Sequence, residues 1–226
     1  FTVLLSANFP ERDLPEGTVD FQRRRTERIV ERAWAAQRLG QLGRKSVRLV
    51  QLLERQIAER SLHRDWMYHG LDGAMAVRAL AALGARESAP ALVEAFRRVD
   101  PALSKVANPE YAQNPVSWTD FRVKMEILPA LGRLRTDAGK RFLFEYLALE
   151  EKQAREFAPP QFEEAAKALL RHKLSADELK SLLQSPHSGV RGEALLECVD
   201  HPTKMRAAVL KEVAAWALDL PSARRY

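Results

Sequence analysis

One pattern constrains the fold of this 226-residue chain more than any other: two short apolar segments joined at a Leu-Gly pair. It is clearest in AVRALAALGARESAPALVEAF, residues 76–96. The apolar residues of each segment follow helical spacing rather than strand alternation: Val77, Leu80 and Leu83 in the first, then Leu92, Phe96 and Val99 in the second. Gly84 suits the left-handed residue just past a helix end, and Ser88 is a natural N-cap. The stretch therefore predicts two antiparallel helices joined by a short turn.

The same pattern recurs along the chain. Leu42-Gly43 lies in residues 31–57 and Leu131-Gly132 in residues 123–149, so the glycines at 43, 84 and 132 are 41 and 48 residues apart. We interpret GRLRTDAGK, residues 132–140, as the turn of the later pair rather than as a phosphate-binding loop, with Thr136 as the N-cap of its second helix. Helical arrays of the HEAT and armadillo type repeat every ~40–47 residues. The spacing therefore indicates an array.

Two shorter pairs follow. Residues 162–185 carry a capping box, in which Ser175 caps a helix and Glu178 reaches back. Residues 188–220 place Pro202 at the start of their second helix. We therefore predict an all-α fold, a right-handed α-α superhelix of about five helix pairs. It spans residues 21–226 and follows an extended arm at residues 1–20.

An irregular insert interrupts the array at residues 100–120. It contains NPEYAQNPVSW, in which two Asn-Pro pairs preclude a continuous helix because a residue before proline avoids the helical region. We expect this insert to account for the wider spacing of the second and third glycines.

The residues that recur between the pairs resemble those of bacterial HEAT-like repeats, an armadillo-type class also seen in phycobilisome lyase modules. The shared elements are Val77-Arg78 and Val190-Arg191 near the start of a first helix, and Ala-Pro-Ala-Leu at 89–92 opening a second helix. The resemblance covers roughly residues 26–220. It implies stacked helix pairs with a continuous core and a concave face that binds a protein or peptide. It implies no particular chemistry.

Composition narrows the class of protein. Hydrophobic residues make up 46% and charged residues 29% of the chain, as in an ordinary folded domain. The single cysteine, Cys198, excludes an internal disulfide framework and a cysteine-based zinc site, and favours a reducing, cytoplasmic location. We expect Cys198 to be a small core residue, and we expect no membrane span because no apolar run is long enough. The chain begins with Phe1, so we expect a processed form or a piece of a longer chain.

We find no pattern that predicts catalysis. His63 and His69 are six residues apart, no HExxH occurs, and no histidine is followed by glutamate, so the spacing of metal ligands is missing. The five histidines are interpreted as surface residues or residues with local hydrogen bonds. Nucleotide-binding and nucleophile-elbow motifs are also missing. We therefore predict no catalytic residue, no cofactor and no metal.

Charge leaves one alternative open. Residues 1–64 carry 13 of the 36 Lys+Arg and 8 of the 30 Asp+Glu, and the arginines cluster in FQRRRTERIVERAW, residues 21–34. Interleaved Glu27 and Glu31 suit a solvated helix face, on which we place Arg32. The alternative is a nucleic-acid-binding HEAT-like protein resembling the alkylpurine DNA glycosylases, with Trp66 beside Asp65 or Trp118 near Asp120 in its site.

We favour a non-catalytic scaffold that binds a protein or peptide. Nucleic acid is a possible partner that the charge distribution does not favour. The residues we expect to contact the partner are basic or aromatic: Arg24, Arg28, Arg78, Tyr111 and Trp118.

Overall fold

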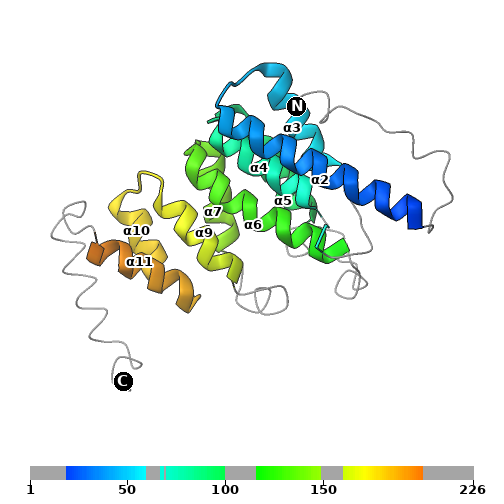
Figure 1. Cartoon of the computed structure of the whole chain (residues 1–226). Helices are drawn as coiled ribbons and strands as arrows, with labels where there is room; N and C mark the ends of the chain where they lie inside the picture. The colour runs from blue at the N-terminus through cyan, green and yellow to red at the C-terminus, as the bar shows by residue number, and fades with distance from the viewer. Residues whose placement is uncertain (1–18, 60–66, 69, 100–115, 149–159, 201–226) are drawn as a thin grey trace. The chain divides into compact units, whose positions relative to one another are not determined.

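The computed structural model describes residues 19–59, 67, 68, 70–99, 116–148 and 160–200. These residues form nine α-helices and one short 3-10 helix, with no strand among them (Figure 1). The predicted all-α class is thereby confirmed. The chain divides into two compact units, residues 1–140 and residues 141–226, and each unit is described by itself.

The first unit is built from five complete helices. They are α2 (Val19–Leu42), α3 (Val47–Ala58), α4 (Leu71–Ala82), α5 (Ala89–Val99) and α6 (Val116–Leu134), with the 3-10 helix η1 (Arg86–Ser88) before α5. The helix α7 (Asp137–Leu147) begins in this unit and continues into the second.

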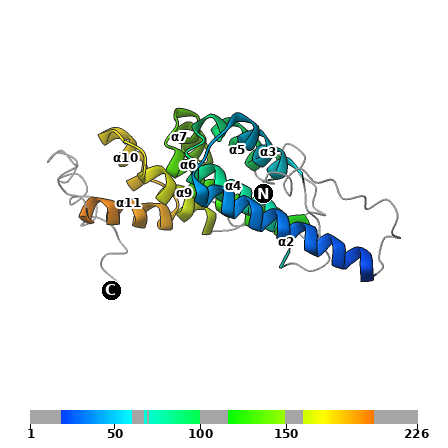
Figure 2. The same cartoon turned by 45° about the horizontal axis from the view of Figure 1, so that its top comes forward.

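These helices pack in two layers. In one layer α4 lies between α2 and α6, and in the other α3 packs against α5 (Figures 1 and 2). The layers meet where α3 contacts α4 and where α5 contacts α6. Alternate helices along the chain therefore become neighbours, as stacked helix pairs require.

Helices α2 and α4 run in the same direction. Arg32 of α2 lies beside Asp72 of α4, and eight residues later a Cβ on Gly40 would come within 2.9 Å of the Ala79 Cα. Such a close approach of two backbones is possible only where one residue lacks a side chain. Gly40 therefore permits the tight packing of α2 on α4.

Two of the predicted turns are confirmed by their backbone. Gly43 and Gly84 are left-handed, with φ of 66° and 61°, and Ser46 caps α3 by accepting a hydrogen bond from the Leu49 backbone at 3.2 Å. Leu83, one of the apolar residues at helical spacing in the first predicted helix of this pair, is buried. Ser88 was wrongly predicted as an N-cap, because its hydroxyl is buried in η1 and makes no hydrogen bond with the described residues.

The third turn lies later than predicted. Gly132 is inside α6, which also accommodates Pro129 and ends at Leu134, and the left-handed residue is Arg135, with φ of 50°. Thr136 caps α7 as predicted, since its hydroxyl accepts a hydrogen bond from the Gly139 backbone at 3.1 Å. The turn between α6 and α7 is thus Arg135–Thr136, three residues beyond the expected glycine.

The boundaries of the predicted irregular segments also change. Helix α6 begins at Val116, so residues 116–120 of the predicted insert are helical, and residues 100–115 lie outside the described residues. Helix α2 begins at Val19, so the last two residues of the predicted arm are helical. Residues 1–18 lie outside the described residues.

The second unit contains α9 (Pro160–Leu170), α10 (Ala176–Leu183) and α11 (Ser188–Asp200), together with most of α7. Helix α11 packs against both α9 and α10. The predicted capping box is confirmed, with the Ser175 hydroxyl and the Glu178 carboxylate each accepting a hydrogen bond from the other's backbone N–H. Cys198 is buried, as expected, and the predicted helix after Pro202 lies outside the described residues.

A column of four stacked rings forms part of the core of the second unit. Ring centroids are 6.1 Å apart between Phe142 and Tyr146, 5.0 Å between Tyr146 and Phe162, and 4.3 Å between Phe162 and His187. His187 and His172 are both buried rather than on the surface, and each makes a local hydrogen bond, its backbone N–H donating to the Ser185 hydroxyl at 3.2 Å and to the Leu169 carbonyl at 2.9 Å respectively. The rings join α7, α9 and the turn before α11 into one core.

Candidate functional site

The structure does not bring the predicted partner-contacting residues into one site. Arg24 is exposed and Arg28 half-buried on the N-terminal half of α2, whereas Arg78 is exposed near the C-terminal end of α4. Because Arg32 is level with the first turn of α4, Arg24 and Arg28 lie beyond the start of that helix. Tyr111 and the side chain of Trp118 lie outside the described residues.

Arg78 connects two helices of one layer. Its guanidinium donates a hydrogen bond to the Glu126 carboxylate of α6, and the two side chains are 55% and 20% exposed. The hydrogen bond to Glu126 raises the pKa of Arg78 despite the opposing effect of partial burial. Arg191, the arginine of the second Val-Arg pair, instead donates to the carbonyls of Ser185 and Pro186 before α11. The two Val-Arg pairs therefore have different structural roles.

The turns between paired helices are connected by a repeated contact. Lys45 extends its ammonium to the Gly84 carbonyl at 3.5 Å, and Arg86 donates to the Arg135 carbonyl at 2.9 Å. Each donor is two residues after the left-handed residue of its own turn, and each acceptor is the left-handed residue of the next turn. The first contact is supported by an ion pair between Lys45 and Glu87 at 3.1 Å.

This contact identifies equivalent positions in successive helix pairs. Gly43, Gly84 and Arg135 are equivalent, and so are Lys45 and Arg86. The residue two positions after Arg135, equivalent to the donors Lys45 and Arg86, is Asp137. An ionised carboxylate only accepts hydrogen bonds, so Asp137 cannot donate to a further turn in the same way. Successive turns of the first unit thus share a left-handed residue and are joined by the same kind of contact.

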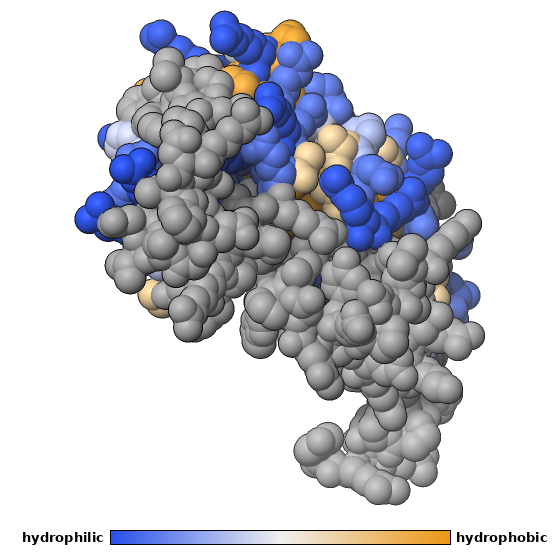
Figure 3. All heavy atoms as spheres, turned by 90° about the vertical axis from the view of Figure 1, so that its right-hand side faces the viewer, coloured by the Kyte–Doolittle hydropathy of each residue, from blue (hydrophilic) through white to orange (hydrophobic). Residues whose placement is uncertain are grey.

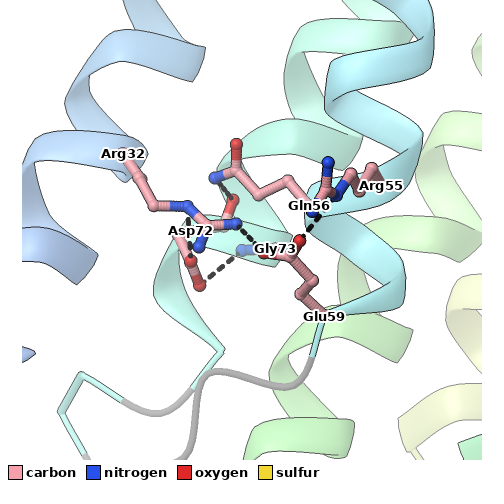
Figure 4. A network of polar contacts seen from close by, with 6 residues as sticks. All are labelled: Arg32, Arg55, Gln56, Glu59, Asp72 and Gly73. Atoms are coloured by element: carbon pink, nitrogen blue, oxygen red, sulfur yellow. Dashed lines mark hydrogen bonds and ion pairs between the residues drawn. The ribbon is translucent and has the colours of Figure 1, made fainter. Parts of the chain in front are cut away.

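The most buried group of charges lies where α2, α3 and α4 meet (Figure 4). Arg32 is only 6% exposed and lies between two carboxylates, with its Nη2 2.8 Å from Glu59 and its Nε 3.4 Å from Asp72. Arg55 contacts the other oxygen of Glu59 at 2.9 Å. Burial alone would raise the pKa of Glu59, but hydrogen bonds and charges from Arg32 and Arg55 lower it.

Backbone contacts complete this network. Asp72 is fully buried in the first turn of α4, where its carboxylate accepts a hydrogen bond from the Gly73 N–H at 2.9 Å. The side-chain amide of Gln56 donates to the Asp72 carbonyl at 2.9 Å, which fixes the end of α3 against the start of α4 (Figure 4). A buried carboxylate needs such a counter-charge and such donors to remain ionised. The arrangement therefore fits a structural connection between three helices.

The sequence-based interpretation missed this network. Arg32 was placed on a solvated face because Glu27 and Glu31 precede it, but Arg32 is on the face of α2 that also buries Ile29, Ala33 and Ala36. The signal that could have identified it is the charged residue at a core-facing position of the helical pattern. Its partner Asp72 is forty residues away in the chain, and no local pattern connects the two.

Among the described residues no group of three or more His, Cys, Asp or Glu could hold a metal ion. No described helix is both long enough and apolar enough to cross a membrane. Comparison of the chain with protein-family models, curated proteins and solved structures gives no match.

Proposed function

We propose that this chain is a HEAT-like helical-repeat scaffold whose function is to bind a protein partner. The observation that carries the proposal is the repeated turn contact, in which Lys45 and Arg86 each reach the left-handed residue of the next turn. Together with the parallel packing of α2 and α4, it supports a stack of equivalent helix pairs. Such stacks present the exposed sides of successive helices as an extended binding surface, concave in HEAT-like arrays.

Arg78 is the proposed anchor for an acidic group of the partner. It is half-exposed, and its present counter-ion is Glu126 of the neighbouring helix, which a carboxylate of the partner can replace at little cost. Arginine is enriched among the residues that dominate binding energy. Arg24, Arg28, Tyr111 and Trp118 are proposed as further contacts.

The test begins with the full chain as bait, followed by reconstitution of a complex from the purified chain and a captured protein. We expect Arg78→Ala to weaken that complex by about tenfold or more, as expected for an interface arginine. Arg98→Ala is the matched control, because Arg98 is an exposed arginine on α5, in the other helix layer. Its affinity should stay unchanged.

Two results would overturn the proposal. One is that no protein forms a stoichiometric complex with the purified chain. The other is that DNA or RNA binds with a salt-dependent affinity tighter than ~10⁻⁴ M while no protein binds, since that would indicate phosphate recognition. Fluorescence anisotropy across salt concentrations measures the second.

A further inference from the structure

The outward face of α2 carries four exposed residues at the spacing of a helix-packing seam. Glu27, Glu31, Trp34 and Arg38 follow one another at intervals of four, three and four residues, and we call this set the α2 seam. Trp34 is 48% exposed in the middle of it. Intervals of three and four keep residues on one side of a helix, where they can contact a second helix along its length.

One position of the α2 seam, Arg38, corresponds to buried positions of α4 and α6. Arg38, Ala79 and Ala130 are equivalent, because each lies five residues before the left-handed residue of its turn. Ala79 and Ala130 are both 2% exposed, and Ala79 faces Gly40 of α2. In α2 the equivalent position holds an exposed arginine, which is too large for so close an approach and suits a neighbour that supplies a carboxylate.

The charges along the α2 seam are arranged so that a second, antiparallel copy of the seam would bring opposite charges together. Glu27 and Glu31 lie N-terminal to Trp34, and Arg38 lies C-terminal to it. The described part of the chain gives Glu31 no hydrogen bond or ion pair, and Arg38 donates only to the neutral Gln41 side chain there. An antiparallel copy of the same helix would place its own acidic half against Arg38 and its arginine against the acidic pair.

The α2 seam holds one large apolar ring, Trp34, among three charged side chains. On the face shown in Figure 3, where described residues are visible, hydrophilic side chains predominate and apolar atoms appear only in small separate areas. A surface of this kind selects its partner through charge pairing around a few large side chains rather than through a wide apolar patch.

We propose that two copies of this chain associate through the α2 seam. The two α2 helices run antiparallel about a two-fold axis near Trp34, so that each Arg38 faces the acidic pair Glu27 and Glu31 of the other copy. Such an interface is isologous, and every pairing occurs twice. The association uses a different surface from Arg78, while the equivalence of Arg38 with Ala79 rests on the same repeated turns as the proposed function.

The test is a charge exchange measured by sedimentation velocity over a range of concentrations. The unmodified chain should form dimers. Glu31→Arg and Arg38→Glu should each weaken dimerisation by about tenfold or more, because each places like charges together twice. The double variant restores opposite charges and should recover most of the affinity.

Two controls keep the result interpretable. Glu94→Arg, at an exposed site on α5, should leave dimerisation unchanged, and circular dichroism should show the same helix content in every variant. Trp34→Ala should weaken dimerisation through loss of the central ring. A chain that stays monomeric up to about 100 µM, which is weaker than ordinary specific association, would overturn the proposal. So would a double variant that dimerises no better than either single variant.

Discussion

In the network around Arg32, which joins three helices, we expect single residues to have large effects on the stability of the molecule. Asp72 is fully buried and Arg32 is nearly so, and each is the counter-charge that makes the burial of the other tolerable. The Gly73 backbone N–H donates a hydrogen bond to the Asp72 carboxylate, and the Gln56 side chain donates one to the Asp72 backbone carbonyl. Removing one charge therefore costs more than the pair contributes in isolation, because the remaining ion stays buried without this counter-charge.

Arg32→Met should lower the free energy of unfolding by about 3–5 kcal/mol, since it leaves the Asp72 carboxylate buried without its counter-charge. The double variant Arg32→Met, Asp72→Asn should recover part of that loss because no net charge is then buried. Urea unfolding followed by circular dichroism measures both. If the single variant were as stable as the parent chain, the packing of Arg32 against Asp72 would be wrong.

The lowered pKa of Glu59 predicts how the stability that this network contributes changes in acid. Its pKa in the folded chain is lowered from the ordinary value of 4.5, so its contribution is present above that value and is lost as pH falls through the folded-state pKa. Glu59→Gln should therefore destabilise the chain more at pH 7 than near pH 3. Urea unfolding of the two proteins at both pH values measures this. Glu94→Gln, on exposed α5, should show no such pH-dependent difference.

The helix ends could be predicted from the sequence where a residue at the end itself determines the backbone conformation or caps the helix. Gly43 and Gly84 are left-handed, and Thr136 and Ser175 cap helices, because each of these residue types satisfies a local backbone requirement. Gly132 failed as a helix end because α6 continues past it and Arg135 adopts the left-handed conformation instead. A glycine permits that conformation, but it does not compel it.

The candidate site was less predictable than the helices for a physical reason. Arg78 was identified from a local motif, but its contact with Glu126 depends on how two helices pack. The same holds for Arg32, whose burial depends on α3 and α4 rather than on its neighbours in the sequence. Local residue patterns determine helix ends and apolar faces, whereas these ion pairs require the positions of helices far apart in the chain.

Two leucines at equivalent helix ends, Leu42 and Leu83, allow a matched comparison of an exposed and a buried position. Leu42 and Leu83 each precede the left-handed glycine of a turn, yet Leu42 is 60% exposed and Leu83 is 9% exposed. Leu83→Asp should lower the free energy of unfolding by more than about 3 kcal/mol, because it buries an unpaired charge. Leu42→Asp should change it by only about 0.5 kcal/mol. Equal thermal midpoints for the two variants would contradict the assigned burial.

At the scale of the whole chain, each of the two compact units has its own buried core. Leu80 is fully buried in the first unit and Leu169 is fully buried in the second. Contacts are concentrated within each unit, and proteins open locally in contiguous cooperative units rather than uniformly. A core substitution should therefore act mainly on the unit that contains it.

Leu80→Ala should reduce the opening free energy of α3, α4 and α5 by about 2–5 kcal/mol, the usual cost of removing a buried leucine side chain. Leu169→Ala should do the same for α9, α10 and α11. Native-state hydrogen exchange in low urea, measured on peptides from each unit, separates the two effects because partial unfolding exposes one set of amides before the other. Each variant is the control for the other. If either substitution lowered protection equally in both units, the chain would unfold as one cooperative body, and the division near Lys140 would carry no energetic meaning.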